Sequence, residues 1–119
     1  MIVAGFGFRG TATLASLQDA FSRVGGQADA LAAPADKAGE ECLLQLAQSL
    51  LLPVLVVMPV DLQSQVTVTQ AGRVIAARGT GSVAEAAAMA GAGPGARLVQ
   101  TRVISGDRLA TAALAEGGA

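Results

Sequence analysis

The residues best suited to bind a ligand lie at the start of the chain. Apolar residues that can form a buried strand break into Gly5-x-Gly7-x-Arg9-Gly10-Thr11, and a helical pattern follows. Glycines let the backbone approach a ligand closely, and the N–H groups of a helix N-terminus attract anions. Arg9 adds a planar cation with several donors. We therefore predict that Gly5, Gly7, Arg9, Gly10 and Thr11 form an anion-binding turn.

Lys37 and Glu40 are the candidate catalytic pair. Lys37 is the single lysine of the chain and precedes a predicted helix. A lysine is most simply interpreted as a solvated surface charge, but a partly buried one could act as a base or hold a carboxylate. Glu40 could share the proton handling. A carboxylate in the first turn of a helix is also explained by the helix dipole alone.

A second ligand-binding group is predicted around Ser82. The spacing of Ser82 and Glu85 is that of a capping box, which explains both residues without any chemistry. The glycine-rich turn before them, with Thr80 and Gly81, supplies N–H groups that could bind a second anion. Thr80, Gly81, Ser82 and Glu85 are therefore predicted ligand-binding residues.

A dinucleotide site is an alternative, because Gly5-x-Gly7-x-x-Gly10 matches the Rossmann fingerprint. The chain is barely longer than one of the two halves that such a fold needs. The acidic residue that should bind the ribose is also misplaced, since Asp29 precedes the second predicted strand and Asp36 follows Pro34. A small nucleotide-binding domain and a turn without a ligand both remain open alternatives.

The amino-acid composition argues against several classes of function. The 119 residues suit one domain, predicted to span 1–119, and they include no His and one Cys, Cys42. Histidine catalysis is excluded, and neither a protein-held metal nor another cofactor is expected. The net charge of −1 and the dispersed arginines do not suit nucleic acid. No apolar run is long enough for a membrane span, and we expect a cytoplasmic protein.

Strand-like and helix-like segments alternate along the chain, which predicts an α/β fold. We expect three layers, with a mainly parallel sheet, helices on both faces and a C-terminal antiparallel hairpin. Residues 36 and 37 are expected in a loop and Asp61 in a turn. The predicted strands are 2–7, 28–33, 54–58, 97–104 and 109–115, and the predicted helices are 14–24, 40–51, 69–78 and 83–90. The carboxyl ends of parallel strands would bring residues 5–11, 36–37, 59–61 and 79–82 to one rim.

Three stretches together resemble one family. They are Gly5-Phe6-Gly7-Phe8-Arg9-Gly10-Thr11, Asp36-Lys37-x-x-Glu40, and Gly81-Ser82-Val83-Ala84-Glu85-Ala86-Ala87-Ala88. In order and spacing they resemble the CobE family of small cobalamin-biosynthesis proteins, which is similar to the C-terminal domain of CbiG. The resemblance extends over nearly the whole chain.

The resemblance implies a role in corrin-ring construction, near the ring contraction and the loss of a two-carbon fragment. The implied ligand is a precorrin-type tetrapyrrole polycarboxylate, bound by a helper or a lactone-opening factor. If the protein is an enzyme, the implied class is a hydrolase acting on a precorrin C–C or lactone linkage. The alternative is a non-catalytic carrier or chaperone that hands the ring to a precorrin methyltransferase.

Overall fold

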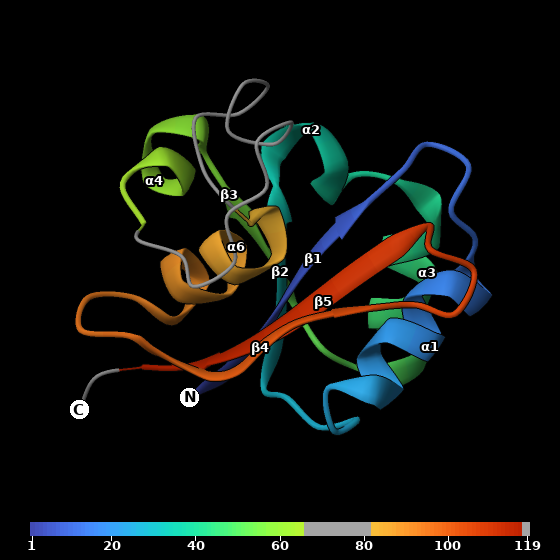
Figure 1. Cartoon of the computed structure of the whole chain (residues 1–119). Helices are drawn as coiled ribbons and strands as arrows, with labels where there is room; N and C mark the ends of the chain where they lie inside the picture. The colour runs from blue at the N-terminus through green and yellow to red at the C-terminus, as the bar shows by residue number, and fades with distance from the viewer. Residues whose placement is uncertain (66–81, 118–119) are drawn as a thin grey trace.

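A five-stranded sheet forms the centre of the protein, with the strand order β3-β2-β1-β5-β4 (Figure 1). The computed structural model describes residues 1–65 and 82–117. β1, β2 and β3 run parallel, whereas β5 runs antiparallel to both β1 and β4. The α/β fold and its C-terminal hairpin are therefore as the sequence predicts. The strands are β1 (Ile2–Phe8), β2 (Ala30–Pro34), β3 (Val54–Val57), β4 (Arg97–Ile104) and β5 (Ala110–Glu116).

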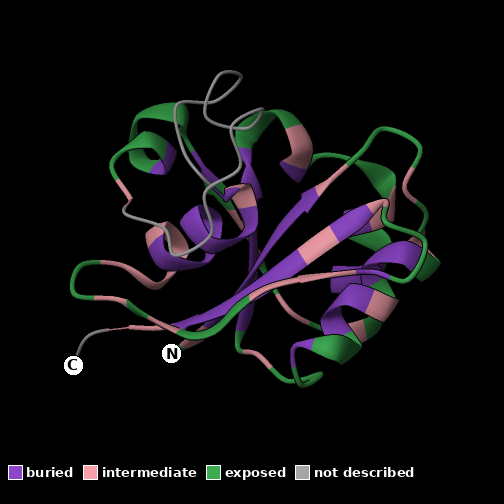
Figure 2. Cartoon of the chain, in the orientation of Figure 1, coloured by how far each residue is buried: buried purple, intermediate pink, exposed green. Residues whose placement is uncertain are grey.

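Helices cover both faces of the sheet. α1 (Leu14–Arg23) and α3 (Glu41–Leu50) share a buried cluster with one face, in which the Phe6 and Phe21 rings lie 6.3 Å apart. α4 (Pro59–Gln63) and α6 (Val83–Ala92) share a second cluster with the other face. Figure 2 shows the buried residues concentrated on the strands and on the inner sides of the helices. Phe6 is thus a core residue.

The start of α1 follows from its local sequence. Thr13 caps the helix: its side chain accepts a hydrogen bond from the Ser16 N–H, and the Ser16 side chain accepts one from the Thr13 N–H. This reciprocal pair satisfies two donors that a helix start leaves open. The helix therefore begins at Leu14, three residues after Thr11, instead of directly after the glycine turn.

Two short helices replace predicted loop segments. Lys37 lies in α2 (Ala35–Ala38), where a loop was expected, and Asp61 lies in α4, where a turn was expected. Pro34 and Pro59 are the cause, because a proline ends a strand yet fits the start of a helix, where its missing N–H costs nothing. α6 also extends two residues beyond its predicted end. The predicted helix 69–78 lies outside the described residues.

Gly5 and Gly7 lie inside β1, in agreement with the predicted strand 2–7, and not in the turn that follows it. A Cβ atom on Gly5 would stand 2.2 Å from the Ala84 carbonyl oxygen and 2.3 Å from the Ala88 nitrogen, both in the backbone of α6. The alanine run of α6 therefore packs directly on the backbone of β1. Gly5 is required by this close approach of helix and strand.

Within the described part of the chain, no helix has the length and apolar character needed to cross a membrane.

Candidate functional site

A cavity of about 430 Å³ lies beyond the carboxyl end of β1, where β1 meets the antiparallel β5. Its walls come from several elements: the end of β1, α2, the start of α6, the end of β4, and the turn and first residues of β5. The lining residues are Gly7, Phe8, Arg9, Lys37, Val83, Arg102, Ile104, Arg108, Leu109, Ala110 and Thr111. We call this the cationic cavity.

Four cations line the cationic cavity, namely Arg9, Lys37, Arg102 and Arg108. No carboxylate occurs among the lining residues that the structure describes. The Lys37 ammonium stands 5.3 Å from the centre of the Phe8 ring, a cation–π contact that holds it on the cavity wall. Half of the eight basic residues of the chain thus gather in one hollow, although the net charge is −1. A hollow whose charged side chains are all positive attracts anionic ligands.

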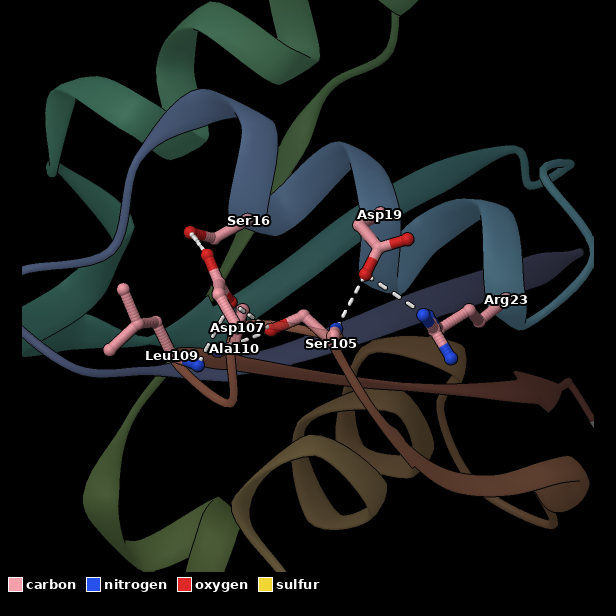
Figure 3. A network of polar contacts seen from close by, with 8 residues as sticks. Ser16, Asp19, Arg23, Ser105, Asp107, Leu109 and Ala110 are labelled. Carbon is pink, nitrogen blue, oxygen red and sulfur yellow. Dashed lines mark hydrogen bonds and ion pairs between the residues drawn. The ribbon is translucent and has the colours of Figure 1, made fainter.

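The turn between β4 and β5 carries Arg108 and is fastened by Asp107 (Figure 3). The Asp107 carboxylate accepts hydrogen bonds from the Ser16 hydroxyl at 2.5 Å, the Ser105 hydroxyl at 2.6 Å and the Leu109 N–H at 3.1 Å. The hydrogen bond from Ser105, followed by the one from Ser16, lowers the pKa of Asp107. The turn is therefore attached to α1 through a charged acceptor.

Asp19 of α1 makes the second attachment. Its carboxylate accepts the Gly106 N–H at 2.6 Å and the Arg23 Nε–H at 3.0 Å, and Figure 3 shows both contacts. The hydrogen bond from the Gly106 backbone is the main cause of the lowered pKa of Asp19. The carboxylates of Asp19 and Asp107 thus both hold the turn against α1.

Glu85 does not line the cationic cavity but contacts Arg102, which does. It is fully buried in the first turn of α6, and its Oε2 accepts the backbone N–H of Arg102 at 2.8 Å. Ser82, also fully buried, caps α6 by accepting the Glu85 N–H at 3.3 Å. Both residues were predicted to bind a ligand. The structure buries both at the start of α6, and neither lines the cationic cavity.

The structure brings three of the predicted site residues, Gly7, Arg9 and Lys37, to the cationic cavity. The Glu40 N–H donates to the Lys37 carbonyl at 3.0 Å, but Glu40 lines a separate hollow together with Gly10 and Thr13. Their predicted roles in binding or catalysis remain predictions. The predicted residues that do not line the cationic cavity are Gly5, Gly10, Thr11, Glu40, Ser82 and Glu85, while Thr80 and Gly81 lie outside the described residues.

Sequence reasoning missed Arg102 and Arg108. Arg102 lies in the predicted strand 97–104, and Arg108 directly precedes the predicted strand 109–115, so the predicted hairpin was the available signal. The missing step was the pairing of β5 antiparallel to β1, which sets Ala110 opposite Phe8. This pairing carries the turn to the carboxyl end of β1, where Arg9 already stands.

The geometric basis for a dinucleotide site is absent. In a Rossmann turn the glycines lie between the strand and the helix, at the N-terminus that receives the pyrophosphate. Here Gly5 and Gly7 are strand residues, and Thr13 caps the helix. Asp29 accepts the Ile2 N–H at 2.7 Å at the opposite end of β1. Gly5 and Gly7 of the fingerprint are thus explained by packing against α6 and β5, whereas a Cβ atom on Gly10 would meet nothing within 4 Å.

Comparisons with known proteins agree with this arrangement. A family described as "Cobalamin synthesis G C-terminus" matches residues 2–115. The chain belongs to this family. The match runs from the first residue of β1 to residue 115 in β5, and it includes every residue that lines the cationic cavity. Among curated proteins, none gives a significant match.

Two solved structures of cobalamin-biosynthesis proteins are similar to this family member. The crystal structure of CobE, a protein from the cobalamin (vitamin B12) biosynthetic pathway, has a TM-score of 0.80 and 31% identity, covering 97% of this chain and 89% of that one. The cobalamin biosynthesis protein chiG from Agrobacterium tumefaciens has a TM-score of 0.72 and 32% identity, with both chains fully covered. The chain is therefore a protein of the cobalamin biosynthesis pathway.

Proposed function

We propose that the cationic cavity binds a precorrin-type tetrapyrrole polycarboxylate near the ring-contraction step of cobalamin biosynthesis. The observation that carries the proposal is the set of four cations around one hollow, with no carboxylate among its described lining residues. Arginine and lysine are the side chains that bind carboxylates most strongly, and arginine can do so with two parallel hydrogen bonds. A ligand with several separated carboxylates matches such a set.

The apolar part of the cavity matches the rest of the ligand. Phe8, Ile104 and Leu109 line it between the cations. A precorrin is a broad apolar ring with carboxylate side chains at its periphery. Ring atoms would lie against the apolar side chains, while the peripheral carboxylates reach the guanidinium groups. Binding sites commonly combine apolar walls with a few placed polar groups in this way.

The size of the cavity favours a helper that holds one edge of the ring. Ligand pockets range over roughly 300–1,000 Å³, and this one lies toward the lower end of the range. A tetrapyrrole with its side chains is a large ligand, so its opposite edge would project from the protein. That edge would then be available to a partner enzyme such as a precorrin methyltransferase. Lactone opening is the alternative, with Lys37 as the group that handles the proton.

Titration with hydrogenobyrinic acid, followed by visible absorbance, tests the proposal. We expect a saturable spectral change with the wild type and about tenfold weaker binding with Arg9→Ala, because one carboxylate loses its cation. Arg97→Ala is the matched control, since Arg97 is exposed at the far end of β4 and pairs with Glu116. A wild-type protein that gives no spectral change at high micromolar ligand would contradict the proposal.

Two further measurements separate the alternatives. A chemical change in a bound precorrin that Lys37→Ala abolishes, while binding is retained, would indicate an enzyme. Transfer of the intact ring to a methyltransferase would indicate a carrier. Protection from thermal unfolding by NAD or FAD would instead favour a nucleotide site.

A further inference from the structure

Arg108 has an unusual backbone conformation at the edge of the cationic cavity. Its φ is +64°, in the left-handed region, although it is neither glycine nor asparagine. A residue with a Cβ atom adopts this region at a cost, so the surrounding structure must hold it there. Its N–H donates to the Ser105 carbonyl at 2.9 Å, which closes the turn. The same conformation places the Arg108 side chain on the cavity wall.

Asp107 is the centre of the contacts that hold this turn. Its two oxygens accept three hydrogen bonds, from Ser16 of α1, from Ser105 before it and from Leu109 after it. The Ser105 hydroxyl oxygen in turn accepts the Ala110 N–H at 3.1 Å. The residues on both sides of Arg108 are therefore fixed by one carboxylate, and that carboxylate is tied to a helix.

The turn also holds Arg9. The Arg9 N–H donates to the Leu109 carbonyl at 2.9 Å, immediately beyond the end of β1. Leu109 is the residue whose N–H donates to Asp107. Two of the four cations, Arg9 and Arg108, are thus joined through Leu109 to the same acceptor.

We propose that Asp107 is a positioning residue, which fixes Arg108 and Arg9 as a clamp for two ligand carboxylates. The inference rests on the proposed function of the cationic cavity. Asp107 itself does not line the cavity. Its charge alone would weaken anion binding, because a carboxylate near the cavity repels an anion. If Asp107 positions the two arginines, removing its carboxylate should weaken ligand binding. If only its charge matters, the same change should strengthen ligand binding.

The sign of the effect of Asp107→Asn is the first test, with hydrogenobyrinic acid as the probe. Loss of positioning should weaken binding about fivefold, whereas simple removal of a negative charge should tighten it. Asp29→Asn is the matched control. Asp29 is also exposed and accepts a backbone N–H, but it lies at the opposite end of β1, and its substitution should change affinity less than about twofold. Unchanged or tighter binding by Asp107→Asn would overturn the inference.

A double-mutant cycle with Arg108→Gly shows whether Asp107 acts through Arg108. Glycine accepts a positive φ without strain, so this variant keeps the turn and removes only the cation. Asp107→Asn should then cost clearly less in the Arg108→Gly background than in the wild type. An equal fold-loss in both backgrounds would overturn the role in positioning Arg108. Should Asp107→Asn fail to fold, Ser16→Ala, which removes one of the three donors, replaces it in the cycle.

Amide hydrogen exchange gives a reading that needs no ligand. The N–H groups of Arg9 and Arg108 should exchange severalfold faster in Asp107→Asn and at the wild-type rate in Asp29→Asn. Unchanged exchange at both amides would overturn the inference while leaving the proposed function intact. A wild-type protein that does not bind the probe would overturn the proposed function and the clamp with it.

Discussion

Gly5→Ala should destabilise the protein strongly, because the added methyl group has no space. It would stand 2.2 Å from the Ala84 carbonyl oxygen and 2.3 Å from the Ala88 nitrogen, whereas ordinary contacts begin at 3.4 Å. The neighbours are backbone atoms of α6, so a side-chain rotation cannot relieve the clash. The helix and the strand would have to separate by about 1 Å.

Separation on this scale would disturb both buried clusters that α6 shares with the sheet. Inserting a methyl group into a packed core costs about 1–3 kcal/mol, and the rigid neighbours place Gly5→Ala at about 3 kcal/mol or more. That is a large part of the roughly 5–15 kcal/mol that stabilises a typical domain. It corresponds to a fall in Tm of about 10 °C for a chain of this size.

Urea and thermal unfolding of Gly5→Ala and Gly10→Ala, followed by circular dichroism, measure the effect. Gly10 is the matched control, since a Cβ there meets nothing within 4 Å, and a change within about 0.5 kcal/mol is expected. Equal stability of the two variants would refute the close packing of α6 on β1. If Gly5→Ala instead folded normally and lost only ligand binding, the result would support the prediction of Gly5 as a ligand-binding residue.

Two more predictions concern the carboxylates around the cavity. Hydrogen bonds lower the pKa of Asp107 and Asp19 below the ordinary value of 3.8. These bonds stabilise the folded state at pH values above the pKa of the unfolded state. Their contribution is lost as the pH falls through the pKa of the folded state. Between about pH 6 and about pH 3, the urea midpoint should therefore fall less in Asp107→Asn than in the wild type, and equal falls would contradict the assignment. Glu85→Ala should cost about 2 kcal/mol in unfolding free energy and weaken hydrogenobyrinic acid binding, because the Arg102 N–H loses its acceptor. Glu116→Ala, an exposed partner of Arg97, should cost less than about 0.5 kcal/mol, and a similar loss in both variants would argue against a special role for Glu85.

Local patterns predicted most of the fold. The helical spacing of Leu17 and Phe21 predicts α1, and the apolar run of Val54 to Val57 predicts β3. The incorrect predictions of local structure concern residue types that fit two different conformations or roles. Pro34 follows the predicted strand 28–33 and Pro59 follows the predicted strand 54–58, but each proline also stands at the start of a short helix. Gly5 and Gly7 fit both a ligand turn and a packed strand, and only the position of α6 distinguishes the two.

The sequence by itself determined most of the elements, the family resemblance and two of the cations, Arg9 and Lys37. These depend on local preferences and on residues close together in the chain, which a sequence displays directly. Only the tertiary structure decided that Arg102 and Arg108 complete the cationic cavity, because the pairing of β5 with β1 joins residues about a hundred positions apart. It also decided that Gly5 serves helix packing and that Asp107 holds the turn. Such roles depend on distances between segments, which no local pattern records.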